Sequence, residues 1–146
     1  MTLPTDNHVH SEWSWDAQNG SIERSCEQAR EIGLPSIAFT EQVDHTIWTA
    51  SIAGLATVPY EHPVAILADA EGQVTPPAFD ATGYLLSIER CRVRFPELRI
   101  LSGLELGEPH WHRDAVQQVL SLGGFDRVLG SLHCLRMAAV SKSRTT

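Results

Sequence analysis

The pair His8-Val9-His10 near the start of the chain has a spacing suited to metal binding. In a β-strand, side chains two residues apart point to the same side, so one short segment can direct both imidazoles at a single ion. Asp16 follows six residues after His10 and can add a carboxylate oxygen once the chain turns back. An aspartate in a loop also commonly bonds its own backbone, so a turn-forming role for Asp16 stays open.

Further potential ligands follow three apolar segments that we predict to be β-strands. After the predicted strands at residues 35–39, 98–104 and 127–132 stand Glu41, Asp44 and His45, then Glu105, then His133. Because the carboxyl ends of parallel strands meet at one edge of a sheet, these side chains should converge with the histidine pair. Imidazole and carboxylate ligands together suit zinc, manganese or iron, and Glu105 can bridge two ions. This pattern predicts a metal-dependent hydrolase.

The elements that must position these residues alternate between strand and helix. Apolar residues recur every three or four positions over residues 21–33, 82–95 and 111–122, which predicts three helices. Ser21 is the expected N-cap of the first helix and Gly33 its end. With a first strand at residues 7–10, the alternation predicts an α/β fold with a parallel sheet and right-handed crossovers.

Residues 41–79 form an unusually long connection between a strand and the next helix. The segment is rich in glycine and proline, and connections of this length are usually functional. We therefore predict that it is a lid over the site. We assign residues 1–136 to one domain and residues 137–146 to a polar tail that is disordered or out of frame.

Composition narrows the class of partner. The net charge of -7 argues against a nucleic-acid surface, because phosphate backbones are held by clustered lysine and arginine. A small phosphorylated substrate is compatible with this charge if bound metal ions offset the local field. The chain shows no signal segment and no membrane span, and Cys26, Cys91 and Cys134 lack a Cys-x-x-Cys pairing. We therefore predict a cytoplasmic protein with reduced thiols and no membrane partner.

Several other residues have simpler structural explanations. His110 and His112 stand at the start of a predicted helix, where residues two apart diverge, so we expect both to face solvent. Glu108 suits an acidic group near the N-terminus of the same helix. Rim packing or a solvated helix face is expected for Trp13, Trp15, Arg90, Arg92 and Arg94.

Four short motifs contain most of the candidate ligands: Asp6-Asn-His-Val-His-Ser, Ala38-Phe-Thr-Glu, Gly103-Leu-Glu and Gly130-Ser-Leu-His. They resemble the first four motifs of the PHP (polymerase and histidinol phosphatase) family, and the stretch at residues 83–91 is most similar to its histidinol-phosphatase branch. The resemblance implies a distorted (β/α)7 TIM-like barrel with up to three divalent metal ions. It implies hydrolysis of phosphoric monoesters, above all histidinol phosphate in histidine biosynthesis. It also implies that the metal ligands are His8, His10, Asp16, Glu105 and His133, and that the catalytic set is His8, His10, Glu105 and His133.

The chain departs from the family pattern in two places. The second motif of the family ends Thr-Glu-His, whereas this chain has Gln42, whose amide is a poor ligand for a zinc-like ion. His45 is an alternative ligand. The later motifs of the family, a further histidine and an Asp-x-His, do not follow His133.

These departures lead to an expectation for the chain as a whole. We expect the first four strand units of a barrel, in a truncated chain that has little activity by itself. Uncovered sheet edges should favour self-association. The alternative functions are a non-catalytic remnant and a PHP phosphodiesterase or exonuclease that acts on nucleic acid.

Overall fold

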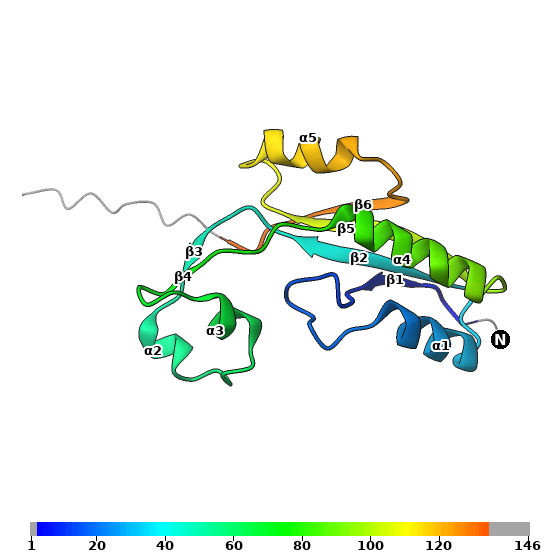
Figure 1. Ribbon diagram of the computed structural model, residues 1–146, viewed down its shortest axis with the longest axis horizontal. Coiled ribbons are helices and arrows are strands. Elements are labelled where there is room, and N and C mark those ends of the chain that lie inside the picture. Colours follow the sequence, from blue (N-terminus) through cyan, green and yellow to red (C-terminus); the bar gives the residue numbers. More distant parts are fainter. Residues whose placement is uncertain (1–2, 135–146) are drawn as a thin grey trace, which may run out of the picture.

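The computed structural model describes residues 3–134, which form a parallel β-sheet, helices packed against it and a small inserted lobe (Figure 1). The predicted polar tail at residues 137–146 lies outside the described residues. The main sheet and its helices are β1 (Asp6–Val9), α1 (Ile22–Ile32), β2 (Ser36–Val43), α4 (Ala81–Arg94), β5 (Arg99–Gly107), α5 (Arg113–Ser121) and β6 (Arg127–Ser131). The insert contains β3 (Trp48–Thr49), α2 (Ile52–Leu55), α3 (Pro63–Leu67) and β4 (Gln73–Val74).

All neighbouring strands of the main sheet are parallel and lie in the order β1-β2-β5-β6. This topology confirms the predicted α/β class and the partial TIM-like barrel, of which the sheet is a curled half. The strand β2 is buried along its whole length and pairs with β5 from Ser36 opposite Arg99 to Val43 opposite Leu106. The two strands are the rigid centre of the fold.

Both central strands extend further than the sequence predicted. The strand β2 continues to Val43 instead of ending at residue 39, and β5 continues to Gly107 instead of residue 104. Glu41 and Glu105 therefore lie within strands, and the prediction that they follow the strands was wrong. Each strand is paired on both sides, so the backbone ladder continues through polar residues that an apolar pattern leaves out.

Side chains of the sheet alternate between an outer face, covered by helices, and an inner face. The outer face holds the main core, in which α1 and α4 pack on β2 and β5 through Ile22, Cys26, Ile37, Phe39, Tyr84, Ile88, Phe95 and Ile100. Further along the same face, α5 lies over Val43, Leu104 and Leu106. The alternation places Thr40, Gln42 and Glu105 on the inner face, opposite the helices.

The ends of the helices follow local chemistry. The Oγ of Ser21 accepts a hydrogen bond from the backbone N–H of Arg24 at 3.3 Å, and Gly33 adopts a φ of 77°, so both predicted ends of α1 are confirmed. In contrast, α5 begins at Arg113 instead of residue 111. Glu108, with a φ of 44°, starts a turn that delays the helix.

The insert is a small folded lobe beyond the carboxyl end of β2 (Figure 1). The strands β3 and β4 pair antiparallel, with Trp48 opposite Val74, and α2 and α3 lie between them in the chain. The ring of Trp48 packs edge-on against that of Trp15 at a centroid distance of 5.3 Å. This contact joins the lobe to the loop after β1 and agrees with the packing role predicted for Trp15.

The cysteines are free, as predicted. Cys26 and Cys91 are buried, and burial raises the pKa of Cys26 to about 12. Near neutral pH the Cys26 thiol therefore stays protonated. Among residues 3–134, no helix has the length and apolar character needed to cross a bilayer.

Candidate metal centre

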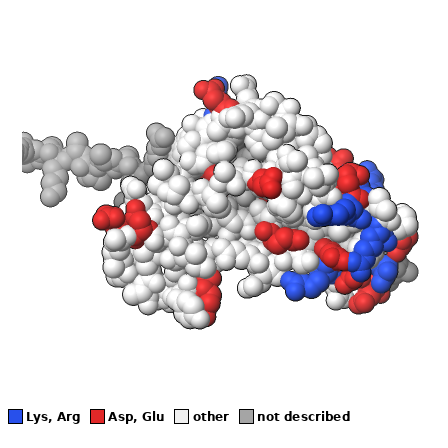
Figure 2. Space-filling model, viewed as in Figure 1, with Lys and Arg blue, Asp and Glu red and all other residues white. Residues whose placement is uncertain are grey.

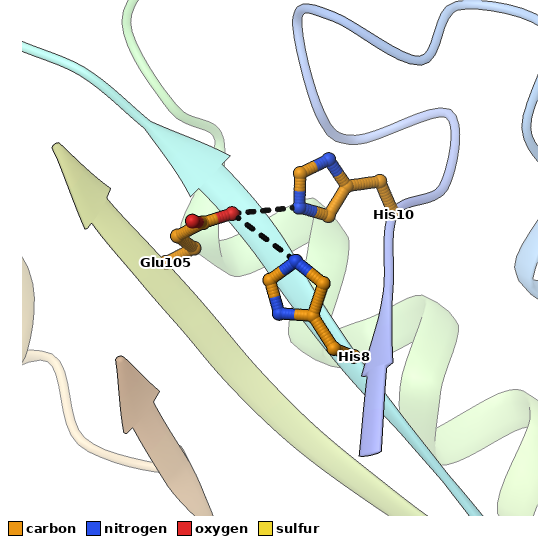
Figure 3. A group of neighbouring side chains, drawn as sticks. All are labelled: His8, His10 and Glu105. Atoms are coloured by element: carbon orange, nitrogen blue, oxygen red, sulfur yellow. Dashed lines mark hydrogen bonds and ion pairs between the residues drawn. The ribbon is translucent and has the colours of Figure 1, made fainter. Parts of the chain in front are cut away.

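His8, His10 and Glu105 meet on the inner face of the sheet, where their ligand atoms all lie within 4.8 Å of one another (Figure 3). The Oε2 of Glu105 lies 3.0 Å from the Nε2 of His10 and 3.4 Å from the Nε2 of His8. Ligands about 2.1 Å from a tetrahedral ion are roughly 3.4 Å apart, so these atoms fit the coordination sphere of one ion. Two imidazoles and one carboxylate are also a suitable donor set for zinc, manganese or iron.

His133 approaches the other oxygen of the same carboxylate. Its Nε2 lies 3.4 Å from the Oε1 of Glu105, so the two oxygens of Glu105 face imidazoles on opposite sides. A carboxylate in this position can bridge two ions. The structure thus brings together His8, His10, Glu105 and His133, four of the five predicted metal ligands, around one side chain of β5.

Asp16 lies behind His10 and not between the converging nitrogen atoms. Its two oxygens accept from the Nδ1 of His10 at 3.1 and 3.2 Å, on the side of the ring away from Glu105. The hydrogen bond to Asp16 raises the pKa of His10, burial opposes the rise, and Glu105 adds to it. In this geometry Asp16 orients the imidazole so that Nε2 faces the centre.

His8 has a comparable support. The hydroxyl of Thr40 lies 3.1 Å from the Nδ1 of His8, while the Nε2 of His8 faces Glu105. Thr40 was not predicted as part of the site, because a threonine inside an apolar strand has no pattern that distinguishes it. Its contact with His8 depends on the pairing of β1 with β2, which joins segments far apart in the sequence.

Glu41 does not join the centre, so its proposed convergence with the other ligands was wrong. The side chain is fully buried and accepts hydrogen bonds from the backbone N–H of Ser11 at 3.0 Å and from the hydroxyls of Ser11 and Ser14, each at 2.6 Å. Burial raises the pKa of Glu41, and these hydrogen bonds partly offset the rise. Glu41 lies on the outer face and fixes the loop that follows the histidine pair.

Gln42 and Asp44 lie next to His133. The Nε2 of Gln42 donates to the Oδ2 of Asp44 at 3.0 Å and lies 3.3 Å from the Nδ1 of His133. The indole N–H of Trp15 also donates to this Asp44 oxygen at 3.0 Å. Burial raises the pKa of Asp44 against the effect of these two donors, and the Oδ1 of Asp44 is buried without a partner among the described residues.

His45 does not join the cluster of His8, His10 and Glu105. Its ring lies 5.9 Å from that of His112, and it is not among the residues whose ligand atoms converge. Burial lowers the pKa of His45, and His112 lowers it further. The hypothesis that His45 replaces the histidine missing at Gln42 is therefore not supported by this geometry.

Glu108 has a different role from the one predicted. It is fully buried, and its Oε1 accepts hydrogen bonds from the backbone N–H groups of His133 and Cys134. The predicted position near the start of α5 was wrong because the turn at Glu108 directs its side chain toward the end of β6. Glu108 holds in place the segment that contains His133.

The related prediction that His112 faces solvent was also wrong, since its Nε2 lies 2.8 Å from the hydroxyl of Thr46.

The arginines of α4 serve the outer side of the fold. Arg92 pairs with Glu89 and Asp126, and Arg94 pairs with Glu23 and Glu27 of α1. Figure 2 shows arginine side chains gathered over the end of the molecule that contains α1 and α4. Arg90 and Arg94 are exposed and Arg92 is partly exposed, which agrees with the solvated helix face expected for them.

The sequence profile of the PHP domain matches residues 6–145. This match covers nearly the whole chain, and the chain therefore belongs to the PHP family. Its inner-face cluster of His8, His10 and Glu105 has ligand atoms close enough together to hold a metal ion. Comparison with curated proteins gave no match.

Two solved structures share the fold. Histidinol phosphate phosphatase from Lactococcus lactis subsp. lactis, in complex with zinc, L-histidinol and phosphate, covers 90% of this chain with a TM-score of 0.64 and 22% identity. The putative histidinol phosphatase from Listeria monocytogenes covers 90% with a TM-score of 0.61 and 18% identity. This chain spans 40% and 46% of the lengths of those two chains. At such identities the likeness establishes the fold alone.

Proposed function

We propose that the chain is a metal-dependent phosphoric monoester hydrolase of the histidinol-phosphatase type. The observation that carries the proposal is Glu105, whose two oxygens face His8 and His10 on one side and His133 on the other. Membership of the PHP family supports a hydrolase. The ligands of the Lactococcus lactis structure, zinc, L-histidinol and phosphate, support histidinol phosphate as the substrate.

The proposed roles follow from the geometry of the centre. His8, His10 and Glu105 would hold one divalent ion, and His133 with the second oxygen of Glu105 would help to hold another. Divalent zinc, manganese or iron in such a site lowers the pKa of a water molecule and offsets negative charge on phosphate oxygens. Asp16 keeps the Nε2 of His10 directed at the ion, or itself adds a ligand oxygen. We propose no ligand role for Gln42, because its amide nitrogen already donates to Asp44.

The insert is proposed to act as a lid. It starts at the carboxyl end of β2, beside Gln42 and Asp44, and its base is joined to the loop after β1 through Trp15 and Trp48. A lobe in this position can limit access of water and select small substrates. Histidine biosynthesis and a cytoplasmic location remain predictions that accompany this function.

Nucleic acid is the less favoured substrate. The net charge is -7, and the arginines Arg92 and Arg94 are engaged in ion pairs on the outer side of the fold. A phosphodiesterase acting on long nucleic acid would need unpaired cations along a path to the centre. The described charges favour a small monoester.

The function is tested by loading the purified chain with zinc or manganese and measuring phosphate release from histidinol phosphate. A phosphodiester, bis(p-nitrophenyl) phosphate, serves as the competing substrate, and Glu105→Gln as the inactive reference. We expect micromolar or tighter zinc binding and slow, metal-dependent monoester hydrolysis. Faster hydrolysis of the diester would favour the nucleic-acid alternative, and lack of metal binding would favour the non-catalytic remnant.

Self-association through sheet edges is also proposed. The strands β1 and β6 are the edges of the described sheet, and Val128 and Leu132 near the second edge are exposed. Unpaired edges beside exposed apolar side chains favour pairing with another chain. Light scattering coupled to size exclusion should show dimers or larger species, and a monodisperse monomer would contradict this expectation.

A further inference from the structure

The three histidines of the centre share one arrangement, in which one ring nitrogen faces Glu105 and the other is held from behind. For His8 the second nitrogen meets Thr40, and for His10 it meets Asp16. A metal-binding histidine usually donates its other ring N–H to an acceptor, which fixes the tautomer and the ring orientation. His133 therefore needs an acceptor for its Nδ1–H if its Nε2 is to bind a cation.

The neighbour of His133 Nδ1 in the structure is a donor. The Nε2 of Gln42 lies 3.3 Å from this nitrogen and 3.0 Å from the Oδ2 of Asp44. The contact with a carboxylate identifies this Gln42 atom as the NH2 group, because a carbonyl oxygen there would face another oxygen. His133 Nδ1 must then accept a hydrogen bond, and the proton of the neutral ring resides on Nε2, which faces Glu105. This tautomer leaves no lone pair on Nε2 for a metal ion.

An unused acceptor lies next to the same nitrogen. The side chain of Asp44 is only 1% exposed, and its Oδ1 is buried without a partner among the described residues, 4.0 Å from the Nδ1 of His133. Burying a carboxylate oxygen without a hydrogen bond lowers the stability of the folded state. A buried and unpaired Oδ1 in Asp44 therefore needs an explanation. Gly107 makes room for this oxygen, since a Cβ at that position would collide with it.

We propose that Asp44 is the positioning residue for His133, accepting the Nδ1–H of the ring when Nε2 binds a metal ion. The ring loses its Nε2 proton and carries one on Nδ1, so the change of tautomer leaves its net charge unaltered. Asp44 then replaces Gln42 as the partner of Nδ1, and the gap of 4.0 Å closes to a hydrogen bond of about 2.9 Å. This inference rests on the proposed metal centre and gives a supporting role to Asp44, which is not among the ligands that the family resemblance implies.

The test follows the imidazole ¹⁵N signals of His133 during zinc titration of the whole chain. Without metal we expect the Nε2–H tautomer, and with zinc we expect a metal-bound Nε2 and a protonated Nδ1. Asp44→Asn should weaken zinc binding at His133 by about 10- to 100-fold, the range for outer partners of metal ligands. Gly107→Ala, which displaces Oδ1 without changing the charge, should weaken it in the same direction.

Two further variants separate this role from a general effect of charge or packing. Gln42→Leu removes the competing donor, so zinc affinity at His133 should be unchanged or higher. Asp114→Asn, an exposed neutralisation in the first turn of α5, should have no effect. Circular dichroism confirms that each variant is folded. Equal losses in Gln42→Leu and Asp44→Asn, or wild-type affinity in Asp44→Asn, would overturn the proposal.

The titration also distinguishes this inference from the proposed function. If zinc shifts the signals of His8 and His10 but leaves the Nε2–H tautomer of His133 intact, the positioning role is overturned while a metal centre remains. If zinc shifts none of the three histidines, both proposals are overturned.

Discussion

Glu41 and Glu105 are buried glutamates on adjacent strands, yet they have opposite surroundings. Glu41 points to the outer face and receives three hydrogen bonds from Ser11 and Ser14. Glu105 points to the inner face, where its oxygens meet imidazole nitrogens at 3.0 to 3.4 Å. The groups around Glu41 donate hydrogen bonds to its oxygens, and no imidazole nitrogen is among them.

The contrast separates a structural carboxylate, Glu41, from the carboxylate that we propose as a metal ligand, Glu105. The hydrogen bonds of Glu41 fix the loop after β1 and leave its oxygens with no open side. The imidazoles around Glu105 can lose their facing protons, and the same atoms then become ligands of a shared ion. The partners of a buried carboxylate, more than its burial, indicate its role.

The largest expected effect is on metal binding at the inner face. Glu105→Gln removes the charge shared by the two proposed ion positions, and zinc affinity should fall by more than about 100-fold, beyond the range for outer partners. Competition with a fluorescent zinc chelator measures this change. The matched variant Glu41→Gln should keep wild-type affinity wherever it is folded, and equal losses in the two variants would erase the contrast.

Glu41→Gln should instead lower the free energy of unfolding, by about 2 kcal/mol, because the amide cannot accept all three hydrogen bonds and leaves buried donors unpaired. Urea denaturation of the metal-free chain measures the loss. Glu105→Gln serves as the comparison and should change this free energy less. Wild-type stability in Glu41→Gln would show that its hydrogen bonds do not support the fold.

Asp16→Asn tests whether Asp16, which contacts His10 on the side away from Glu105, supports the metal centre or binds the ion itself. The amide can still accept from the Nδ1 of His10 but no longer stabilises positive charge on the ring, so zinc affinity should fall by about 10-fold. The same chelator competition measures it. Asp114→Asn provides an exposed control on α5. A loss as large as that of Glu105→Gln would instead indicate that Asp16 binds the ion directly.

The smallest expected effect is a change in the free energy of unfolding with pH, caused by the titration of Glu41. Burial raises the pKa of Glu41 above its ordinary value of 4.5, so the folded state retains a proton that the unfolded chain loses. The contribution of the protonated Glu41 side chain to folding stability is fully present below pH 4.5, and it is lost as the pH rises through the raised pKa. The stability difference between wild type and Glu41→Gln should therefore shrink as the pH rises from 4.5 through the raised pKa of Glu41. A difference that grows with pH would contradict this sign.

Much of the fold follows from local patterns. The helix ends at Ser21 and Gly33, the alternation of strands and helices, and the pairing of His8 with His10 were all predictable, because capping and side-chain alternation act over a few residues. The motif around Glu105 and the position of His133 after β6 were predictable as well. Parallel strands bring their carboxyl ends to one edge whatever their distance in sequence.

The sequence alone therefore determined the fold class, the family and the main set of metal-binding candidates. Only the tertiary structure decided that Glu41 supports a loop, that Glu108 holds the backbone at His133, and that Asp44 lies beside the same histidine. The physical reason is the length and register of the β2 and β5 ladder. A shift of one residue along a strand moves a side chain to the other face, and the register is set by contacts between segments far apart in the chain.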